Sequence, residues 1–165
     1  MEAELDRGTL LRAMEEYFGD DTSRIEHARK VLEYAEDILE AQGHGCERDV
    51  VIAAAVMHDI GIKGAERMHG SSAAKYQEQE GPRVARNILN RLGCTQRIVV
   101  EVCDIIAHHH HPRPIESANF RVLWDADLLA NTEPARMGSG AIPDDKSFYT
   151  ARARELAGAT VSVET

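Results

Sequence analysis

Two adjacent side chains that bind divalent metal ions follow the longest apolar run of the sequence. His58 and Asp59 come directly after eight apolar residues, Val50 to Met57. Burying a carboxylate without a partner is costly, so a group of opposite charge is expected close to Asp59. A divalent metal ion would engage both side chains together. The alternative is a helix end that reaches the surface and leaves Asp59 in water.

Two further residues of the same kinds lie on apolar helical faces. His27 shares a face with Val31, and Asp127 follows Trp124 within the segment VLWDADLLA. Asp125 points about 200° away from Asp127 by helical geometry. A lone histidine on such a face can be a hydrogen-bonded core residue, but three helices that each direct a metal-type ligand inward favour one shared metal site.

The proposed ligands are two imidazoles and two carboxylates, from His27, His58, Asp59 and Asp127. This mixed nitrogen and oxygen set suits Mn²⁺, Fe²⁺, Co²⁺, Ni²⁺ or Zn²⁺, and magnesium is also compatible with it, whereas an all-oxygen calcium site fits less well. Four protein ligands leave positions of an octahedron open for water or a substrate oxygen. An open position is typical of a catalytic rather than a structural metal site.

The residues that must position these ligands are helical nearly throughout. A chain of 165 residues, 43% hydrophobic and 28% charged, fits one globular domain. Because no run alternates polar and apolar residues between turn signals, we expect an all-α, single-domain compact bundle of about six to eight helices over residues 1–158, with a flexible tail at 159–165.

The periodicity and the turn residues predict the following helical segments. They are 5–17, 23–42 with a capping box of Ser23 and Glu26, 50–57, 71–92 interrupted at Gly81-Pro82, 95–111, 118–131 and 146–157, with a loop at 137–145.

Charge and hydrophobicity exclude several classes of function. The net charge of −9 opposes binding to duplex nucleic acid, which needs a clustered basic face. The longest apolar run is far shorter than a membrane helix, and the N-terminus has no signal-peptide pattern, so we expect a cytoplasmic protein without a membrane partner. The odd number of widely spaced cysteines, three, predicts reduced thiols.

The order of the four ligands resembles the HD-domain superfamily of metal-dependent phosphohydrolases. The flanking sequences R-I-E-H-A-R-K-V, H-D-I-G-I-K and L-W-D-A-D-L-L are similar to the motifs of that family, and the likeness covers about residues 20–132. It implies an HD-type helical bundle, the metal ligands proposed above, and hydrolysis of a phosphate mono- or diester, a nucleotide being one candidate.

The run of four histidines at the end of the predicted 95–111 helix, His108 to His111, resembles a further feature of the family. His108 and His109 stand where dinuclear members have a His-His pair, so contact with substrate phosphate and binding of a second metal are alternatives for both. Gln77 stands roughly where those members have another histidine, although His69 could substitute. We therefore expect one ion per chain rather than two, and a solvated loop at His110–His111.

The resemblance also suggests residues that act on the substrate. Lys63 follows the doublet in H-D-I-G-I-K, one residue later than the phosphate-contacting lysine of many relatives. Lys63 and Arg24, which lies one turn before His27, are candidates to balance the phosphate charge, and solvent exposure is the alternative for both. Asp59 or a neighbouring histidine would take the proton of the attacking water.

The expected partner is a small anionic substrate that contains phosphate, and a homo-oligomer is left open. Two other functions remain as alternatives. One is a dinuclear iron oxygenase, since some members of the superfamily use two irons, and the other is a non-catalytic ligand-binding domain that keeps its metal for stability.

Overall fold

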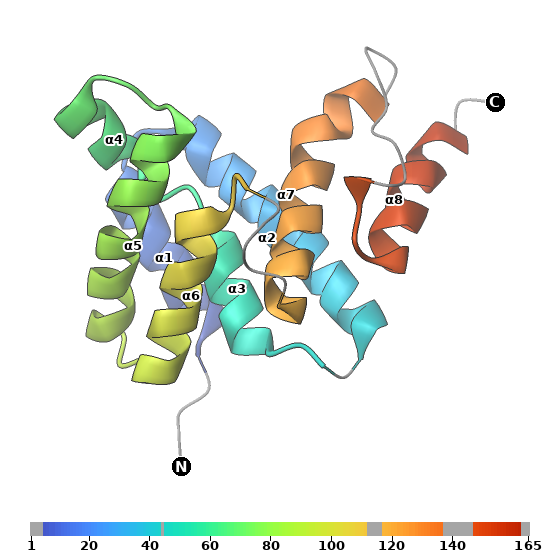
Figure 1. Ribbon diagram of the computed structural model, residues 1–165, viewed down its shortest axis with the longest axis horizontal. Helices are drawn as coiled ribbons and strands as arrows, with labels where there is room; N and C mark the ends of the chain where they lie inside the picture. The colour runs from blue at the N-terminus through green and yellow to red at the C-terminus, as the bar shows by residue number, and fades with distance from the viewer. Residues whose placement is uncertain (1–4, 44, 112–116, 137–146, 163–165) are drawn as a thin grey trace.

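Eight α-helices and no β-strand make up the part of the chain that the computed structural model describes, residues 5–43, 45–111, 117–136 and 147–162 (Figure 1). This confirms the predicted all-α bundle. The helices are α1 (Arg7–Phe18), α2 (Thr22–Gln42), α3 (Arg48–Met57), α4 (Ile62–His69), α5 (Ala74–Arg91), α6 (Gln96–His108), α7 (Ala118–Arg136) and α8 (Ala151–Ser162).

Helix α3 is the centre of the bundle. All eight of its residues from Val50 to Met57 are buried, and α3 packs against α1, α2, α6 and α7 (Figure 1). A helix that is apolar on every side has to be surrounded in this way. The position of α3 therefore brings His58 and Asp59, which follow its last residue, to the interior of the molecule.

The segment that follows Asp59 differs from the prediction. Residues 62–69 form a separate helix, α4, which the sequence analysis did not anticipate. Helix α5 also runs without a break through Pro82, so the predicted interruption at Gly81-Pro82 is wrong. Proline disfavours a helix interior, but packing of α5 against both α4 and α6 stabilises the helix across this position.

Two glycines make that packing possible. A Cβ atom on Gly61 would lie 2.4 Å from the carbonyl oxygen of Gln77 and 2.6 Å from the backbone nitrogen of Gly81. A Cβ atom on Gly81 would lie 2.7 Å from Cγ2 of Ile106. The backbone just after the His-Asp doublet therefore touches the backbone of α5 directly. Gly81, where an interruption of the helix was expected, is one of the residues that make this contact.

Other helix boundaries also shift from the expected ones. Helix α2 begins at Thr22, and its N-cap is Asp21, whose carboxylate accepts a hydrogen bond from the backbone N–H of Arg24. The predicted capping box at Ser23 is therefore wrong. Helix α8 covers Ala151–Ser162 rather than 146–157 and so extends into the predicted tail. The expected loop at 137–145 and residues 163–165 lie outside the described residues.

Asp125 anchors the start of α8 to α7. Its buried carboxylate accepts hydrogen bonds from the backbone N–H of Tyr149 at 2.9 Å and from the N–H and hydroxyl of Thr150, both at 2.7 Å. Burial raises the pKa of Asp125, although these hydrogen bonds act in the opposite direction. Asp125 thus faces α8, as expected from its angular separation from Asp127.

Two expectations from composition can be compared with this fold. Among the described residues, no helix combines the length and the apolar character that crossing a membrane requires. The three cysteines, Cys46, Cys94 and Cys103, are free thiols, as predicted. Burial raises the pKa of each of them, so these thiols are poor nucleophiles.

The contact between the two glycines predicts a large difference between two alanine substitutions. Gly61→Ala should lower the free energy of unfolding by about 1–3 kcal/mol, because its Cβ meets backbone atoms that cannot move aside. The expected fall in Tm is about 2–4 °C for each kcal/mol. Gly158→Ala in α8 is the control, because a Cβ there meets nothing within 4 Å. Thermal unfolding measures both, and an equal loss would contradict the proposed contact.

Candidate metal centre

Three helices bring the four predicted ligands into one group. His27 comes from α2, His58 and Asp59 follow the last residue of α3, and Asp127 comes from α7. Nε2 of His27 lies 3.1 Å from Oδ1 of Asp127 and 3.4 Å from Oδ2 of Asp59. Nε2 of His58 lies 3.2 Å from Oδ2 of Asp59 and 3.4 Å from Oδ1 of Asp127. Both imidazoles therefore direct one nitrogen at the same two carboxylate oxygens.

Backbone hydrogen bonds determine which nitrogen of the buried histidines faces the centre. Nδ1 of His58 donates to the carbonyl oxygen of Ala55 at 2.8 Å, and Nδ1 of His109 donates to that of Ile106 at 2.7 Å. In the neutral form of each ring, Nε2 then carries a lone pair. Metal-ligating histidines are usually held in this way, with the second ring nitrogen bonded to a carbonyl or a carboxylate.

The charges of the group are strongly coupled. Burial lowers the pKa of His58, but the carboxylates of Asp59 and Asp127 outweigh burial and hold the pKa well above its ordinary value. Burial raises the pKa of both aspartates, but the neighbouring histidines outweigh it, so the pKa of each lies below its ordinary value. The centre therefore favours two charged carboxylates with a positive charge between them.

A second group of potential ligands shares Asp59 with the first. Ligand atoms of Asp59, His109 and His110 all lie within 4.8 Å of one another. Nε2 of His109 is 3.3 Å from Oδ1 of Asp59, the oxygen that does not face His27 and His58. His110 lies in the exposed turn that follows α6, as expected, but its ring centroid is 3.8 Å from that of His109 and its Nε2 lies 3.3 Å from Oε1 of Gln77.

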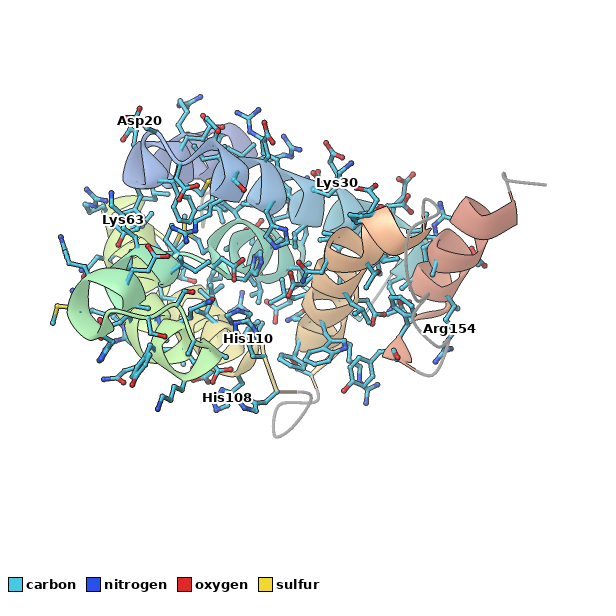
Figure 2. The ribbon with its side chains drawn as sticks, turned by 90° about the horizontal axis from the view of Figure 1, so that it is seen from above. Asp20, Lys30, Lys63, His108, His110 and Arg154 are labelled. Carbon is cyan, nitrogen blue, oxygen red and sulfur yellow. The ribbon has the colours of Figure 1, made fainter. Side chains whose placement is uncertain are left out.

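His108 does not join either group. Its Nδ1 donates to the carbonyl oxygen of Asp104, one turn earlier in α6. In Figure 2, His110 lies nearer the middle of the view than His108, which lies close to the edge of the molecule. The histidines grouped with Asp59 are thus His109 and His110 rather than His108 and His109, because the ring of His108 turns back to the carbonyl oxygen of Asp104 in its own helix.

The remaining predicted residues are held by other partners. Nζ of Lys63 donates to the carbonyl oxygen of Tyr17 at 3.0 Å and lies over the ring of that tyrosine. The guanidinium of Arg24 pairs with Asp21 at 2.8 Å and with Glu66 at 2.5 Å. His69 pairs with Glu80 at 3.1 Å and does not substitute for the histidine that Gln77 replaces.

The residues present fit a divalent cation. Nε2 of His109 is buried and has no hydrogen-bond partner among the described residues, although a carboxylate oxygen lies close to it. Lone pairs that face carboxylate oxygens repel one another unless a proton or a metal ion lies between them. The imidazole nitrogens and carboxylate oxygens are the donor types that first-row divalent metals accept together.

A small cavity opens beside the centre. It has a volume of about 170 Å³ and is lined by His109, His110, Trp124, Asp127, Leu128 and Asn131. Nδ2 of Asn131 donates to Oδ1 of Asp127 at 3.0 Å, so this amide orients the carboxylate. Asn131 and Leu128 were not among the predicted site residues, although their positions one turn after Asp127 and Trp124 place them on the same face of α7.

Comparisons with known proteins agree with this geometry. The HD domain family model matches residues 24–142, a range that contains all four predicted ligands. The crystal structure of a predicted HD superfamily hydrolase from an uncultured Thermotogales bacterium is similar to this chain, with a TM-score of 0.71 and 28% sequence identity. That match covers 94% of this chain and 84% of the other. No curated protein matches the sequence.

Because Oδ1 of Asp127 faces both His27 and His58, replacement of Asp127 should lower the metal content of the protein. Asp127→Ala should weaken binding of Mn²⁺ or Co²⁺ at least about 100-fold, since changes in outer partners of metal ligands alone cost up to about that factor. Asp20→Ala changes an exposed aspartate elsewhere on the surface and should keep full metal content (Figure 2). Elemental analysis after purification compares the two. Full metal content in Asp127→Ala would show that the ligand set is wrong.

The raised pKa of His58 predicts that metal binding depends on pH. A metal ion has to displace the proton of His58, so the apparent affinity should fall about tenfold per pH unit below that pKa and level off above it. The sign follows because protonation of His58 stabilises the metal-free fold at low pH, and this contribution is lost as the pH rises through the pKa. Titration with Co²⁺ between about pH 5 and pH 9 measures it. An affinity independent of pH would contradict the assignment.

Proposed function

The chain belongs to the HD domain family, and we propose that it is a metal-dependent phosphohydrolase that cleaves a phosphate mono- or diester with water. The observation that carries the proposal is the convergence of His27, His58, Asp59 and Asp127 from three helices, next to a cavity. A site of two imidazoles and two carboxylates leaves coordination positions for a substrate oxygen and for water. Membership in this family supports a hydrolase of the metal-dependent type.

In this proposal His27, His58, Asp59 and Asp127 hold one divalent ion, of manganese, iron, cobalt, nickel or zinc, or of magnesium. When bound, the ion supplies positive charge that polarises a phosphoryl oxygen and makes a water molecule more acidic. The protein contributes the orientation of the ligands. His58 is held by the carbonyl oxygen of Ala55, and Asp127 by the amide of Asn131.

His109 is the residue that we assign to proton transfer. Its ring is almost fully buried, with a side chain that is 2% exposed; Nε2 lies 3.3 Å from Oδ1 of Asp59, and the residue lines the cavity. Because Nδ1 is already bonded to the carbonyl oxygen of Ile106, Nε2 is free to accept a proton from the attacking water. The adjacent carboxylate of Asp59 then stabilises the protonated ring.

The substrate in this proposal is a small anionic ester. The cavity next to the centre is lined both by polar groups, among them His109 and His110, and by Trp124 and Leu128, which supply apolar surface. These surfaces would contact the organic part of the ester while its phosphate faces the ion. Lys63 and Arg24 are bound to other groups, so in this scheme the ion and the two histidines balance the phosphate charge instead.

A second candidate rests on the group formed by Asp59, His109 and His110. If this group holds a second ion, the chain has the metal count of a dinuclear iron oxygenase, with Gln77 beside His110 in place of a further ligand. Metal analysis after purification with iron under anaerobic conditions separates the two candidates. One ion per chain is the result expected from the phosphohydrolase proposal, and two irons with oxygen uptake would favour the oxygenase.

The two adjacent histidines provide a sharp test of the proposed mechanism. In a screen of phosphate mono- and diesters with several added metals, His109→Gln should lower kcat by about 10²–10⁴-fold, because it removes the proton acceptor. His108→Gln, one residue earlier and directed outward, should keep activity within about twofold of the unmodified chain. Asp59→Asn should abolish turnover, because it changes both groups of ligands at once.

Two results would contradict the proposal. Equal losses in the His108 and His109 variants would remove the assignment of His109 to proton transfer. An absence of turnover with every ester and every metal, in a chain that still binds the ion, would instead favour the non-catalytic ligand-binding domain.

A further inference from the structure

A basic groove lies on the side of the bundle that α1, α4 and α5 form. We use this name for a depression of about 580 Å³ lined by Tyr17, Arg67, Arg83, Val84, Asn87, Ile88, Asn90 and Arg91. Three of these residues are arginines, and none is an acid. The chain as a whole carries 28 acidic and 19 basic side chains, so a groove lined only by positive charge is unexpected on it.

The arginines of the basic groove are poorly neutralised. Among the described residues, Arg67 and Arg91 form no ion pair, and Arg83 pairs with Glu80 at 3.3 Å, a carboxylate that it shares with His69. Five arginines outside the groove pair with carboxylates at close range. These are Arg7, Arg24, Arg29, Arg97 and Arg152.

The groove also has the shape and the apolar floor of a ligand site. Arg83, Asn87 and Arg91 follow one another at intervals of four residues, so they line one face of α5 over about 12 Å. Val84 and Ile88 lie at the base, with the ring of Tyr17 beside them. Its volume falls in the range of about 300–1,000 Å³ that is common for small-molecule sites.

Lys63 adds positive charge at the margin of the groove. Its Nζ lies 5.3 Å from the ring centroid of Tyr17 and donates to the carbonyl oxygen of that residue. The lysine expected to meet phosphate at the metal centre is thus directed towards Tyr17 instead. In Figure 2, Lys63 and His110 lie in different parts of the molecule.

The basic groove is separate from the metal centre. Its residues come from α1, α4 and α5, whereas the groups around the metal centre come from α2, the end of α3, the end of α6 and α7. Helices α4 and α5 lie at one side of the bundle in Figure 1, and α7 lies on the other side of α3 and α6. A ligand in the groove therefore need not contact the ion or its ligands.

We propose that the basic groove binds a small organic phosphate with a planar ring, as a ligand that is not turned over. Guanidinium groups match phosphate oxygens with paired hydrogen bonds, and they stack on planar rings. Arg67 and Arg83 contact the phosphate, while Tyr17, Val84, Ile88 and Arg91 contact the ring. The amides of Asn87 and Asn90 supply hydrogen bonds to its polar edge.

Charge reversal in the groove tests this assignment. The probe is adenosine triphosphate, with inorganic triphosphate as a probe that has no ring, and binding is measured by calorimetry in the presence of a chelator so that no turnover takes place. Arg67→Glu with Arg91→Glu should weaken binding of adenosine triphosphate at least about tenfold. Arg12→Glu with Arg86→Glu makes the same change of charge outside the groove and should weaken it less than about twofold. Inorganic triphosphate should bind more weakly than adenosine triphosphate.

The remaining outcomes decide between this site and its alternatives. Binding that survives Asp127→Ala is expected, and binding lost in that variant would assign the anion to the metal centre and overturn the proposal. If both arginine double variants weaken binding equally, the effect comes from the overall charge of the chain and not from the groove. Binding of a polyglutamate peptide but of neither phosphate probe would assign the groove to an acidic protein segment. Since none of these measurements uses turnover, they can fail or succeed independently of the proposed hydrolase activity.

Discussion

The repulsion between two largely buried carboxylates is the constraint on which the centre of this molecule depends. Asp59 follows the end of α3 and Asp127 lies in α7, and their side chains are only 18% and 17% exposed. Neither can move to solvent without pulling α3 or α7 out of the core, because both helices carry the residues that fill it. A cation between them would therefore contribute to the packing of the bundle as well as to its chemistry.

The clustering of the four candidate ligands could be predicted from the sequence because burial leaves a clear signal in the residue pattern. The eight apolar residues before His58 require a surrounded helix, and that helix has to deliver whatever follows it to the interior. Asp127 and His27 are polar residues on faces that are otherwise apolar, which is costly unless they meet a partner. Helical periodicity and the cost of desolvation were together sufficient to predict that these residues lie close to one another.

The parts that were not predicted depend on contacts between distant segments. Pro82 normally interrupts a helix, and only the approach of α4 and α6 to α5, made possible by Gly61 and Gly81, explains why α5 continues. His108 was expected beside His109 at the centre but bonds to its own helix instead, because the direction of each ring depends on where α6 ends. Lys63 was expected at the substrate, but Tyr17 lies 46 residues earlier in the chain and gave no local signal of this contact.

Helix α7 carries two aspartates whose side chains point to different sides of the helix. Asp127 faces the metal centre, and two residues earlier Asp125 accepts three hydrogen bonds at the start of α8. A rigid rod that is attached on two sides cannot turn about its long axis, so α7 holds Asp127 at a constant rotational angle. Helix α8, although it contributes none of the four candidate ligands, thus restrains α7 and keeps the carboxylate of Asp127 directed at the candidate metal centre.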